Sequence, residues 1–481
     1  MSASKAAHTA RRWLYLVHRW IGIITCLLFA MWFASGLVMA YVPFPDLTET
    51  ERLVGQEPID WARVGVVPAG TVDALPLTIP RLTMMAGRPV WRMGGHGPDL
   101  CAGTAKTVAP VSGDEAASLA KRFARSTAAG QWRQIERDQW TVAGRYDQYR
   151  PLWQVDLDDA DGTRLYVATA TGEVVLDTTR RERGWNWVGA IPHWLYLTIL
   201  RKDRPLWRQV ILWTSGIAIV GAVTGMWIGI LRVRLLRRYA RGRLTPYCGW
   251  AKWHHLAGLL GGITLITWIV SGWLSVDPNR WFASPGLPDA AYSAFAGGVA
   301  PRRAFDLARL AEVPSARGIT ELRLRRADGR TILDLRGPHG RRVLLDAAQL
   351  APVHLDESRL IRAAGRMLPA YSIVGADRIS AEDEYYYSHD NSLRLPVLRL
   401  AFDDPSRTQV YIDPATGEIA LETDRIRRAY RWWFDALHCL DFKGLGSVRP
   451  AWDIVLWLLA GLGLILSASG VMIGWRRLFR N

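Results

Sequence analysis

The sequence predicts a membrane α-helical bundle of four transmembrane helices with two extramembrane α+β domains, arranged as a tandem internal repeat. Three observations lead to this prediction: four long uncharged runs, an uneven distribution of charge, and residues that recur at a fixed offset. Of the 481 residues, 49% are hydrophobic and 24 are tryptophan, which excludes a disordered chain.

Four charge-free runs are long enough to cross a membrane as helices: residues 21–42, 210–231, 256–276 and 454–475. A helix needs ~20 residues to span the hydrocarbon core. The first run is longer than the ~7–15 apolar residues of a signal peptide. Its motif also recurs in the third run, so we expect it to remain in the mature protein.

These runs divide the chain into segments. The transmembrane helices are expected within residues 1–42, 207–231, 254–276 and 452–475. Two long segments, residues 43–206 and 277–451, are the expected extramembrane domains. A basic loop at residues 232–253 and a tail at residues 476–481 complete the chain.

The basic residues indicate which side of the membrane each segment faces. Between the second and third helices lie seven Lys and Arg residues and no acid, whereas all the acidic residues except Asp453 lie in the two long segments. By the positive-inside rule, both termini and the loop are cytoplasmic. The long segments then face the periplasm of a bacterial inner membrane. A nucleic-acid partner is excluded, because the formal charge of +16 is split among membrane-flanking sites.

The transmembrane helices repeat. Five residues of the first helix recur 236 positions later in the third: His18, Gly22, Trp32, Ser35 and Gly36 match His254, Gly258, Trp268, Ser271 and Gly272. The second and fourth helices repeat with an offset of 245, at which His193 matches His438. The protein is therefore expected to be two tandem halves, with the boundary near residue 245.

The extramembrane segments repeat as well. The sequence "LYVATATGEVV" (165–175) aligns with "VYIDPATGEIA" (410–420), so that Thr171-Gly172-Glu173 matches Thr416-Gly417-Glu418. In each half we expect a helix, then strands with alternating polarity, and a hairpin that turns at Thr-Gly-Glu.

The repeated histidines form two pairs, one at each membrane face. His18 and His254 begin outward-running helices, whereas His193 and His438 precede inward-running ones. Neutral imidazoles from facing helices, in a bundle that excludes water, suit axial ligation of haem. We therefore expect two haem b groups, with iron bound by His18 and His254 on the cytoplasmic side and by His193 and His438 on the periplasmic side.

Two other interpretations of the histidines stay open. A histidine near a helix end is often an interfacial residue that is solvated or hydrogen-bonded. The four could also bind a transition metal in transit, although this predicts further Cys, Met or carboxylate ligands within the helices. No carboxylate occurs in the four runs.

The adjacent histidines of "KWHHLAG" (252–258) are not equivalent. His254 is in register with the first helix, whereas His255 aligns with Arg19 and points ~100° around the helix. We expect His254 to be the ligand and His255 an interfacial or propionate-contacting neighbour. Gly22 and Gly258 follow the cytoplasmic-side histidines by four residues, on the same helix face, where they would let a flat haem approach.

Three stretches carry a resemblance to a known family: "LVHRWIGIITCLLFAMWFASGLVMAY", "YIDPATGEIALETDRIRRAYRWWFDALHCLDF" and "WDIVLWLLAGLGLILSASGVMIGWRR". The chain resembles the PepSY-associated transmembrane proteins, which include inner-membrane ferric-siderophore reductases. The resemblance implies periplasmic PepSY-like domains, haems that carry electrons outward, and reduction of a ferric siderophore or other ferric chelate. Because no flavin module is evident, we expect a cytoplasmic flavoprotein or membrane quinol as electron donor.

The segment "DEYYYSHDNSLRLP" (383–396) is a candidate substrate region. It clusters aromatic side chains with possible iron-contacting groups: Tyr385, Tyr386, Tyr387, His389 and Asp390. The alternative is an edge strand with a polar loop, since strands favour tyrosine.

A second functional class remains open for the whole chain. The protein could be a non-catalytic membrane protein whose PepSY-like domains bind a peptide or protease in the periplasm. In that case the four histidines are dispensable.

Overall fold

The computed structural model describes residues 3–65, 79–94, 98–127, 130–298, 307–388, 393–446 and 448–479. The chain forms two compact units. The first, the helical unit, comprises Met1–Phe44, Glu182–Ala283 and Arg427–Asn481. The second, the sheet unit, comprises Pro45–Arg181 and Ser284–Ile426.

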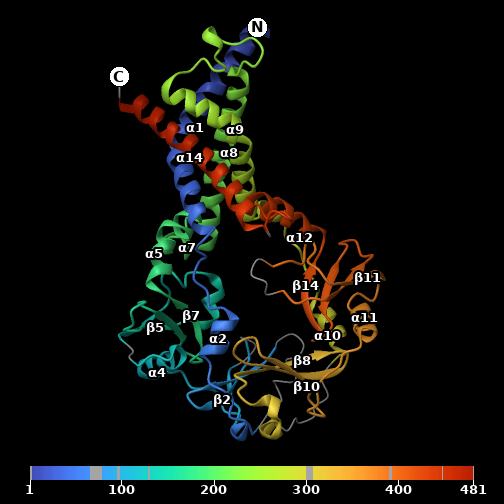
Figure 1. Ribbon diagram of the computed structural model, residues 1–481. Coiled ribbons are helices and arrows are strands. Elements are labelled where there is room, and N and C mark those ends of the chain that lie inside the picture. Colours follow the sequence, from blue (N-terminus) through green and yellow to red (C-terminus); the bar gives the residue numbers. More distant parts are fainter. Residues whose placement is uncertain are drawn as a thin grey trace. The chain divides into compact units, whose positions relative to one another are not determined.

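Within the described residues, four helices are long and apolar enough to span a membrane, which confirms that prediction. They are α1 (Ala3–Met39), α8 (Arg204–Arg232), α9 (Gly249–Ser275) and α14 (Arg449–Phe479), and they pack together as a bundle (Figure 1). Each begins before its uncharged run, so that basic residues lie at the helix ends.

The bundle has a packed interior and an apolar exterior. Phe33 of α1 inserts where α14 has Gly463, since a Cβ there would lie 2.2 Å from the Phe33 ring. Outward-facing residues are also apolar: the side chains of Ile24 and Leu260 are 73% and 72% exposed. An apolar exterior suits a lipid environment rather than water.

Short helices precede α8 and α14. In the first half they are α5 (Arg180–Val188), α6 (Ala190–His193) and α7 (Thr198–Arg201). In the second half α12 (Arg425–Tyr430), a π-helical turn (Arg431–Ala436) and α13 (Leu437–Cys439) take the corresponding place. Helix α6 packs against α1 and α13 packs against α9, which places a histidine from each short helix beside the bundle.

The sheet unit contains two four-stranded antiparallel sheets of the same design. One consists of β4 (Trp132–Ile135), β5 (Leu152–Asp156), β6 (Arg164–Ala168) and β7 (Val174–Thr178), packed on α4 (Gly113–Ala124). The other consists of β11 (Ile373–Ile379), β12 (Val397–Phe402), β13 (Gln409–Asp413) and β14 (Glu418–Thr423), packed on α11 (Glu357–Gly365). The expected helices, strands and α+β class are therefore present.

Both Thr-Gly-Glu turns have the same backbone conformation. Gly172 and Gly417 each have a φ of +67°, in the left-handed region that favours glycine. A Cβ at Gly172 would lie 2.8 Å from the sulfur of Met85, so any side chain is also excluded by packing. The turns close the β6–β7 and β13–β14 hairpins expected from the sequence.

A third sheet is built from both halves of the chain. Its six strands lie in the order β10 (Arg342–Asp346), β9 (Arg330–Arg336), β8 (Glu321–Ala327), β1 (Arg81–Met85), β2 (Arg88–Arg92) and β3 (Leu100–Cys101). Strand β1 pairs antiparallel with β8, and Leu82 lies opposite Leu322 at 0% exposure. We expected two separate extramembrane domains, whereas the halves share this sheet and one compact unit.

Candidate functional site

The structure brings the four repeated histidines together in two pairs. His18 of α1 lies beside His254 of α9, with 6.2 Å between the ring centroids. His193 of α6 lies beside His438 of α13, again with 6.2 Å between the centroids. Each pair takes one histidine from each half of the chain.

Every one of these histidines makes the same hydrogen bond to a neighbouring helix. In each, Nδ1 lies 3.1 Å from a backbone carbonyl oxygen: Gly221 for His18, Trp32 for His193, Leu466 for His254 and Trp268 for His438. A carbonyl can only accept, so Nδ1–H is the donor and Nε2 carries the lone pair. Within the described part of the chain Nε2 has no hydrogen bond, which leaves this nitrogen available as a ligand.

A glycine faces each imidazole from the same helix that supplies the carbonyl. A Cβ at Gly225 would lie 2.6 Å from Cε1 of His18, and one at Gly470 would lie 3.4 Å from Cε1 of His254. At Gly36 and Gly272 the corresponding distances to His193 and His438 are both 3.1 Å. The sequence showed these glycines only as repeat landmarks. The repeat offsets indicate that these glycines are equivalent positions, but they do not indicate that each glycine contacts a histidine of another helix.

Gly22 and Gly258, expected to make room for a haem, have different surroundings. A Cβ at Gly22 would meet no heavy atom within 4 Å, and one at Gly258 would lie 3.4 Å from Cδ1 of Leu466. Neither glycine faces a histidine in the way that Gly225, Gly470, Gly36 and Gly272 do.

His255 is buried and both of its ring nitrogens are engaged. Nδ1 lies 2.8 Å from Oγ1 of Thr245, and Nε2 donates to the carbonyl oxygen of Gly229 at 3.0 Å. The ring of Tyr247 packs edge-on against it at 5.4 Å. His255 therefore connects α9 to α8 and to the loop before α9, and it has no nitrogen left for iron or for a propionate.

The donor set of each pair, two imidazoles with a free Nε2, is of the kind that could hold a haem iron. Among the described residues no group of three or more His, Cys, Asp or Glu could hold a metal. A bare transition-metal ion needs about four protein or water ligands, whereas haem iron asks the protein only for axial ligands. With metal–nitrogen bonds of ~2.0–2.1 Å and the ring centre about 1 Å beyond the nitrogen, a metal that both imidazoles bound through Nε2 would fit between rings whose centroids are about 6 Å apart. Both observed spacings agree with this value.

The candidate substrate region is only partly described. Tyr386 is 5% exposed, stacks on Tyr411 at 5.2 Å, and donates its hydroxyl hydrogen bond to the carbonyl of Arg394. It is thus a core residue of its sheet. Tyr385 and Tyr387 are half-buried beside it. His389 and Asp390 lie outside the described residues.

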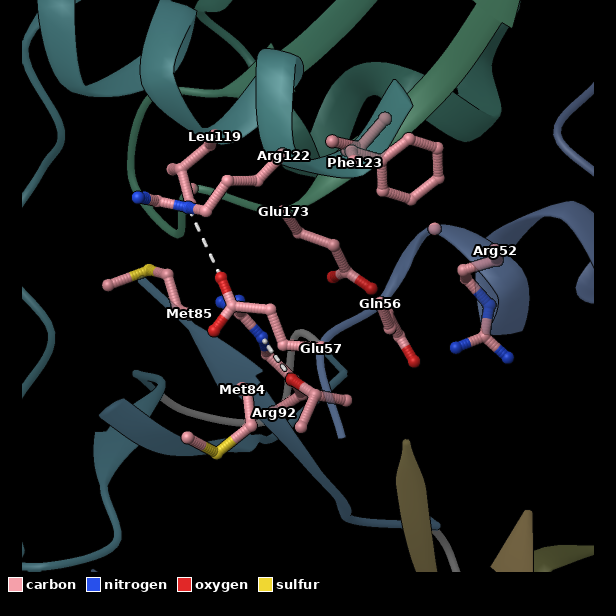
Figure 2. A pocket seen from close by; sticks show the side chains of 14 residues that line it. Arg52, Gln56, Glu57, Met84, Met85, Arg92, Leu119, Arg122, Phe123 and Glu173 are labelled. Carbon is pink, nitrogen blue, oxygen red and sulfur yellow. Dashed lines mark hydrogen bonds and ion pairs between the residues drawn. The ribbon is translucent and has the colours of Figure 1, made fainter. Parts of the chain in front are cut away.

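The sheet unit also contains cavities. A small one of about 50 Å³ lies where α2 (Glu49–Gly55), α4 and β1 meet (Figure 2). On its edge Arg122 pairs with Glu57 at 3.2 Å. A larger cavity of about 430 Å³ is lined by Leu47, Glu49, Arg52, Ile79, Arg81, Tyr149, Glu173, Val174, Val175 and Arg323. Its volume is within the ~300–1,000 Å³ of small-molecule sites.

A buried carboxylate lies beside the larger cavity. Glu321 is 0% exposed and accepts hydrogen bonds from three guanidinium groups, those of Arg52, Arg81 and Arg323. Burial alone raises the pKa of Glu321, but the three cations outweigh it and hold the pKa at about 2. Arg52 and Arg81 come from the first half and Glu321 from the second, so the cluster joins the halves.

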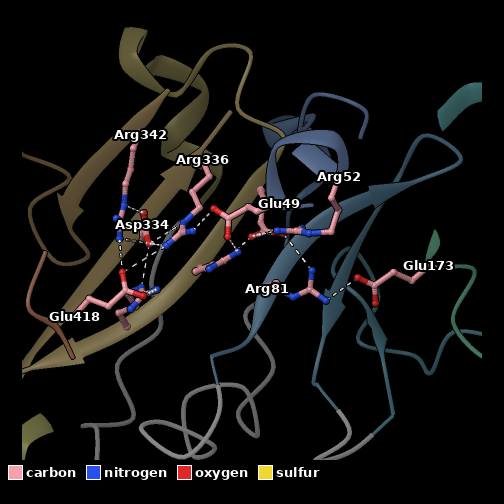
Figure 3. A network of polar contacts seen from close by, with 11 residues as sticks. Glu49, Arg52, Arg81, Glu173, Asp334, Arg336, Arg342 and Glu418 are labelled. Carbon is pink, nitrogen blue, oxygen red and sulfur yellow. Dashed lines mark hydrogen bonds and ion pairs between the residues drawn. The ribbon is translucent and has the colours of Figure 1, made fainter. Parts of the chain in front are cut away.

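A second buried carboxylate extends this network (Figure 3). Asp334 is also 0% exposed and is bound by Arg325, Arg336 and Arg342. Glu49 connects the two clusters, because it pairs with both Arg323 and Arg336. Removing one partner from such a network leaves buried charges unpaired, which costs ~3–5 kcal/mol.

Comparisons with known proteins assign no family to this chain. No protein-family model matches it, and no curated protein matches it. The geometry of the two histidine pairs is therefore the basis for inferring a function.

Proposed function

We propose that the protein is a transmembrane di-haem electron carrier of the bacterial inner membrane that reduces a periplasmic ferric siderophore or other ferric chelate. The observation that carries this proposal is the recurrence of one two-histidine site at two positions of an apolar four-helix bundle. Each site has two imidazoles at 6.2 Å, with Nδ1 tied to a carbonyl and Nε2 free to bind iron.

The orientation follows from the charges. Both termini and the basic loop are placed in the cytoplasm by the positive-inside rule, and the sheet unit in the periplasm. The His18–His254 site is then on the cytoplasmic side and the His193–His438 site on the periplasmic side. Electron transfer across a membrane requires an electron carrier near each face, and the two sites would provide these positions.

A contact repeated in the sheet unit supports the proposed tandem repeat. The hydroxyl of Tyr166 donates to Asp138 at 2.6 Å, and 245 residues later the hydroxyl of Tyr411 donates to Asp383 at 2.9 Å. Both hydrogen bonds join the third strand of a four-stranded sheet to the connection between its first and second strands. Repetition of a buried tertiary contact is stronger support for a duplication than repetition of residue types alone.

Haem bound at these sites supplies a one-electron Fe(III)/Fe(II) couple. The protein fixes the imidazole tautomer through the carbonyls. One electron, from a cytoplasmic flavoprotein or membrane quinol, converts one chelated Fe(III) to Fe(II). Because Fe(II) binds hard oxygen ligands less tightly than Fe(III) does, reduction releases iron for uptake.

A pyridine haemochrome assay on the purified full-length protein from haem-replete cells tests the proposal. Two haems per chain are expected, with a reducible b-type spectrum. A protein without haem would overturn the proposal. If the reduced, haem-loaded protein is not oxidised when a ferric chelate is added, the electron-carrier role stands and the ferric chelate is ruled out as its substrate.

The alternative is a non-catalytic membrane protein that binds a periplasmic peptide. The cavity of about 430 Å³ favours it, because arginines and carboxylates line the same hollow and could bind both ends of a peptide. In this case replacement of all four histidines by alanine leaves ligand binding intact. Under the electron-carrier proposal the same variant loses its colour and its reductase activity.

A further inference from the structure

A hydroxyl group accompanies each carbonyl that binds a histidine. On each helix the carbonyl residue is followed by serine or threonine three positions later and by the contacting glycine four positions later. We name each such triplet a histidine cradle. The four cradles are Trp32, Ser35 and Gly36 on α1; Gly221, Thr224 and Gly225 on α8; Trp268, Ser271 and Gly272 on α9; and Leu466, Ser469 and Gly470 on α14.

Three of the four hydroxyls contact a histidine. The distances from Oγ to Nδ1 are 3.2 Å for Ser35 and His193, 3.0 Å for Ser271 and His438, and 3.3 Å for Ser469 and His254. Each serine donates its own hydrogen to a carbonyl of its helix, at 2.6 to 2.8 Å. The oxygen therefore presents a lone pair to the imidazole, so that Nδ1–H is shared between two acceptors.

The fourth cradle differs. Thr224 matches Ser469 at the offset of 245, but its hydroxyl donates to Val220 and Gly221 of its own helix, at 2.7 and 3.0 Å. Within the described chain it makes no hydrogen bond to His18, whose Nδ1 has the Gly221 carbonyl alone. The His18–His254 site thus has one serine acceptor, and the His193–His438 site has two.

The number of hydrogen-bond acceptors on Nδ1–H affects the reduction potential of the iron through the basicity of the histidine that binds it. An acceptor on Nδ1–H draws that proton away and raises the basicity of Nε2. A more basic axial ligand stabilises Fe(III) relative to Fe(II), so it lowers the reduction potential. The carbonyl is common to all four histidines, and only the serines distinguish the two sites in this respect.

We propose that Ser35, Ser271 and Ser469 are positioning residues that lower the reduction potential of the iron held by their histidines, and that the His193–His438 site has the lower potential of the two. This inference rests on the proposed function, since it concerns haem iron. A low potential at the periplasmic end suits delivery to a chelate whose hard oxygen ligands favour Fe(III).

Potentiometric titration of the full-length protein, monitored by the visible absorbance of reduced haem, tests the inference. Two midpoint potentials are expected, and the lower is assigned by its disappearance in His438→Ala. Ser35→Ala and Ser271→Ala should each raise the lower midpoint, and Ser469→Ala should raise the higher one. Thr224→Ala is the matched control, because it removes a hydroxyl at the equivalent cradle position without touching a histidine, and should shift neither midpoint.

Ser→Cys variants keep the side-chain shape with a slightly larger atom and weaken the acceptor. They should shift the same midpoints in the same direction if an alanine variant fails to fold. Ser271→Thr keeps the hydroxyl and should therefore have the wild-type midpoint potential. Unchanged midpoints in the serine variants, or a shift equal to that of Thr224→Ala, would overturn the inference while leaving the haem proposal standing. A preparation with no haem would instead remove the proposed function itself.

Discussion

The 2.8 Å hydrogen bond between Nδ1 of His255 and Oγ1 of Thr245 separates two adjacent histidines into different roles. His255 uses both nitrogens within the protein, whereas His254 keeps Nε2 free. His254→Ala should therefore remove about one haem per chain, and His255→Ala should retain both while lowering thermal stability. Haem stoichiometry and melting temperature measure the two effects. Loss of haem only from the His255 variant would reverse the assignment.

The glycines of the cradles give a graded prediction. A Cβ at Gly225 would lie 2.6 Å from the His18 ring, closer than any tolerated contact, whereas at Gly470 the distance to His254 is an ordinary 3.4 Å. Gly225→Ala should displace His18 and substantially reduce haem content. Gly470→Ala should have a smaller effect, since its Cβ would lie 3.3 Å from Cβ of Cys26 and 3.4 Å from the His254 ring.

Gly461→Ala is the control, since a Cβ there meets no atom within 4 Å. Haem per chain and the reduced absorption spectrum provide the measurement. Equal loss in the Gly225 and Gly461 variants would point to helix flexibility rather than to contact with the imidazole.

The buried carboxylate Glu321 predicts acid sensitivity of the sheet unit. Its pKa is lowered from 4.5 to about 2 in the folded state, so its ion pairs contribute fully above pH 4.5, and this contribution is lost as the pH falls toward 2. The shift corresponds to about 3 kcal/mol of stability.

Glu321→Gln should therefore unfold at a lower temperature than wild type at pH 7, and the difference should shrink toward pH 2. Asp46→Asn is the control, because Asp46 pairs with Arg145 on the surface, where both side chains are about half exposed. A pH-independent difference between wild type and Glu321→Gln would contradict the assigned charge state.

Tyr386 tests whether the tyrosine cluster is a structural element. Because its ring is buried against Tyr411, Tyr386→Ala should cost ~3–5 kcal/mol in unfolding free energy. Tyr385→Ala, at a half-buried position, should cost less. Denaturant titration of the two variants, with reductase activity measured on the folded fraction, separates stability from substrate contact. A loss of reductase activity in the folded Tyr386→Ala protein would indicate that Tyr386 contacts the substrate.

The transmembrane helices and the histidine pairs could be predicted from the sequence because each depends on a pattern along the chain. Hydropathy locates a spanning helix without knowledge of its neighbours. The offsets of 236 and 245 matched His18 to His254 and His193 to His438, and these are the histidines that lie side by side.

The cradles and the shared sheet depend on contacts between distant segments, so the sequence did not predict them. Gly225 contacts His18 although the two lie on different helices, and spacing along one helix cannot indicate which face meets another. Pairing of β1 with β8 joins Leu82 to Leu322, across 240 positions. Each strand alone resembles an ordinary edge strand, and no local signal identifies its partner.

The pairing of β1 with β8 has a consequence for how the two halves of the chain depend on each other. Neither half can complete the six-stranded sheet, and neither contains both histidines of a pair. A half-length chain would expose an unpaired strand edge, a surface prone to pair with another copy. Each half therefore depends on the other for a complete sheet and for the second histidine of each pair.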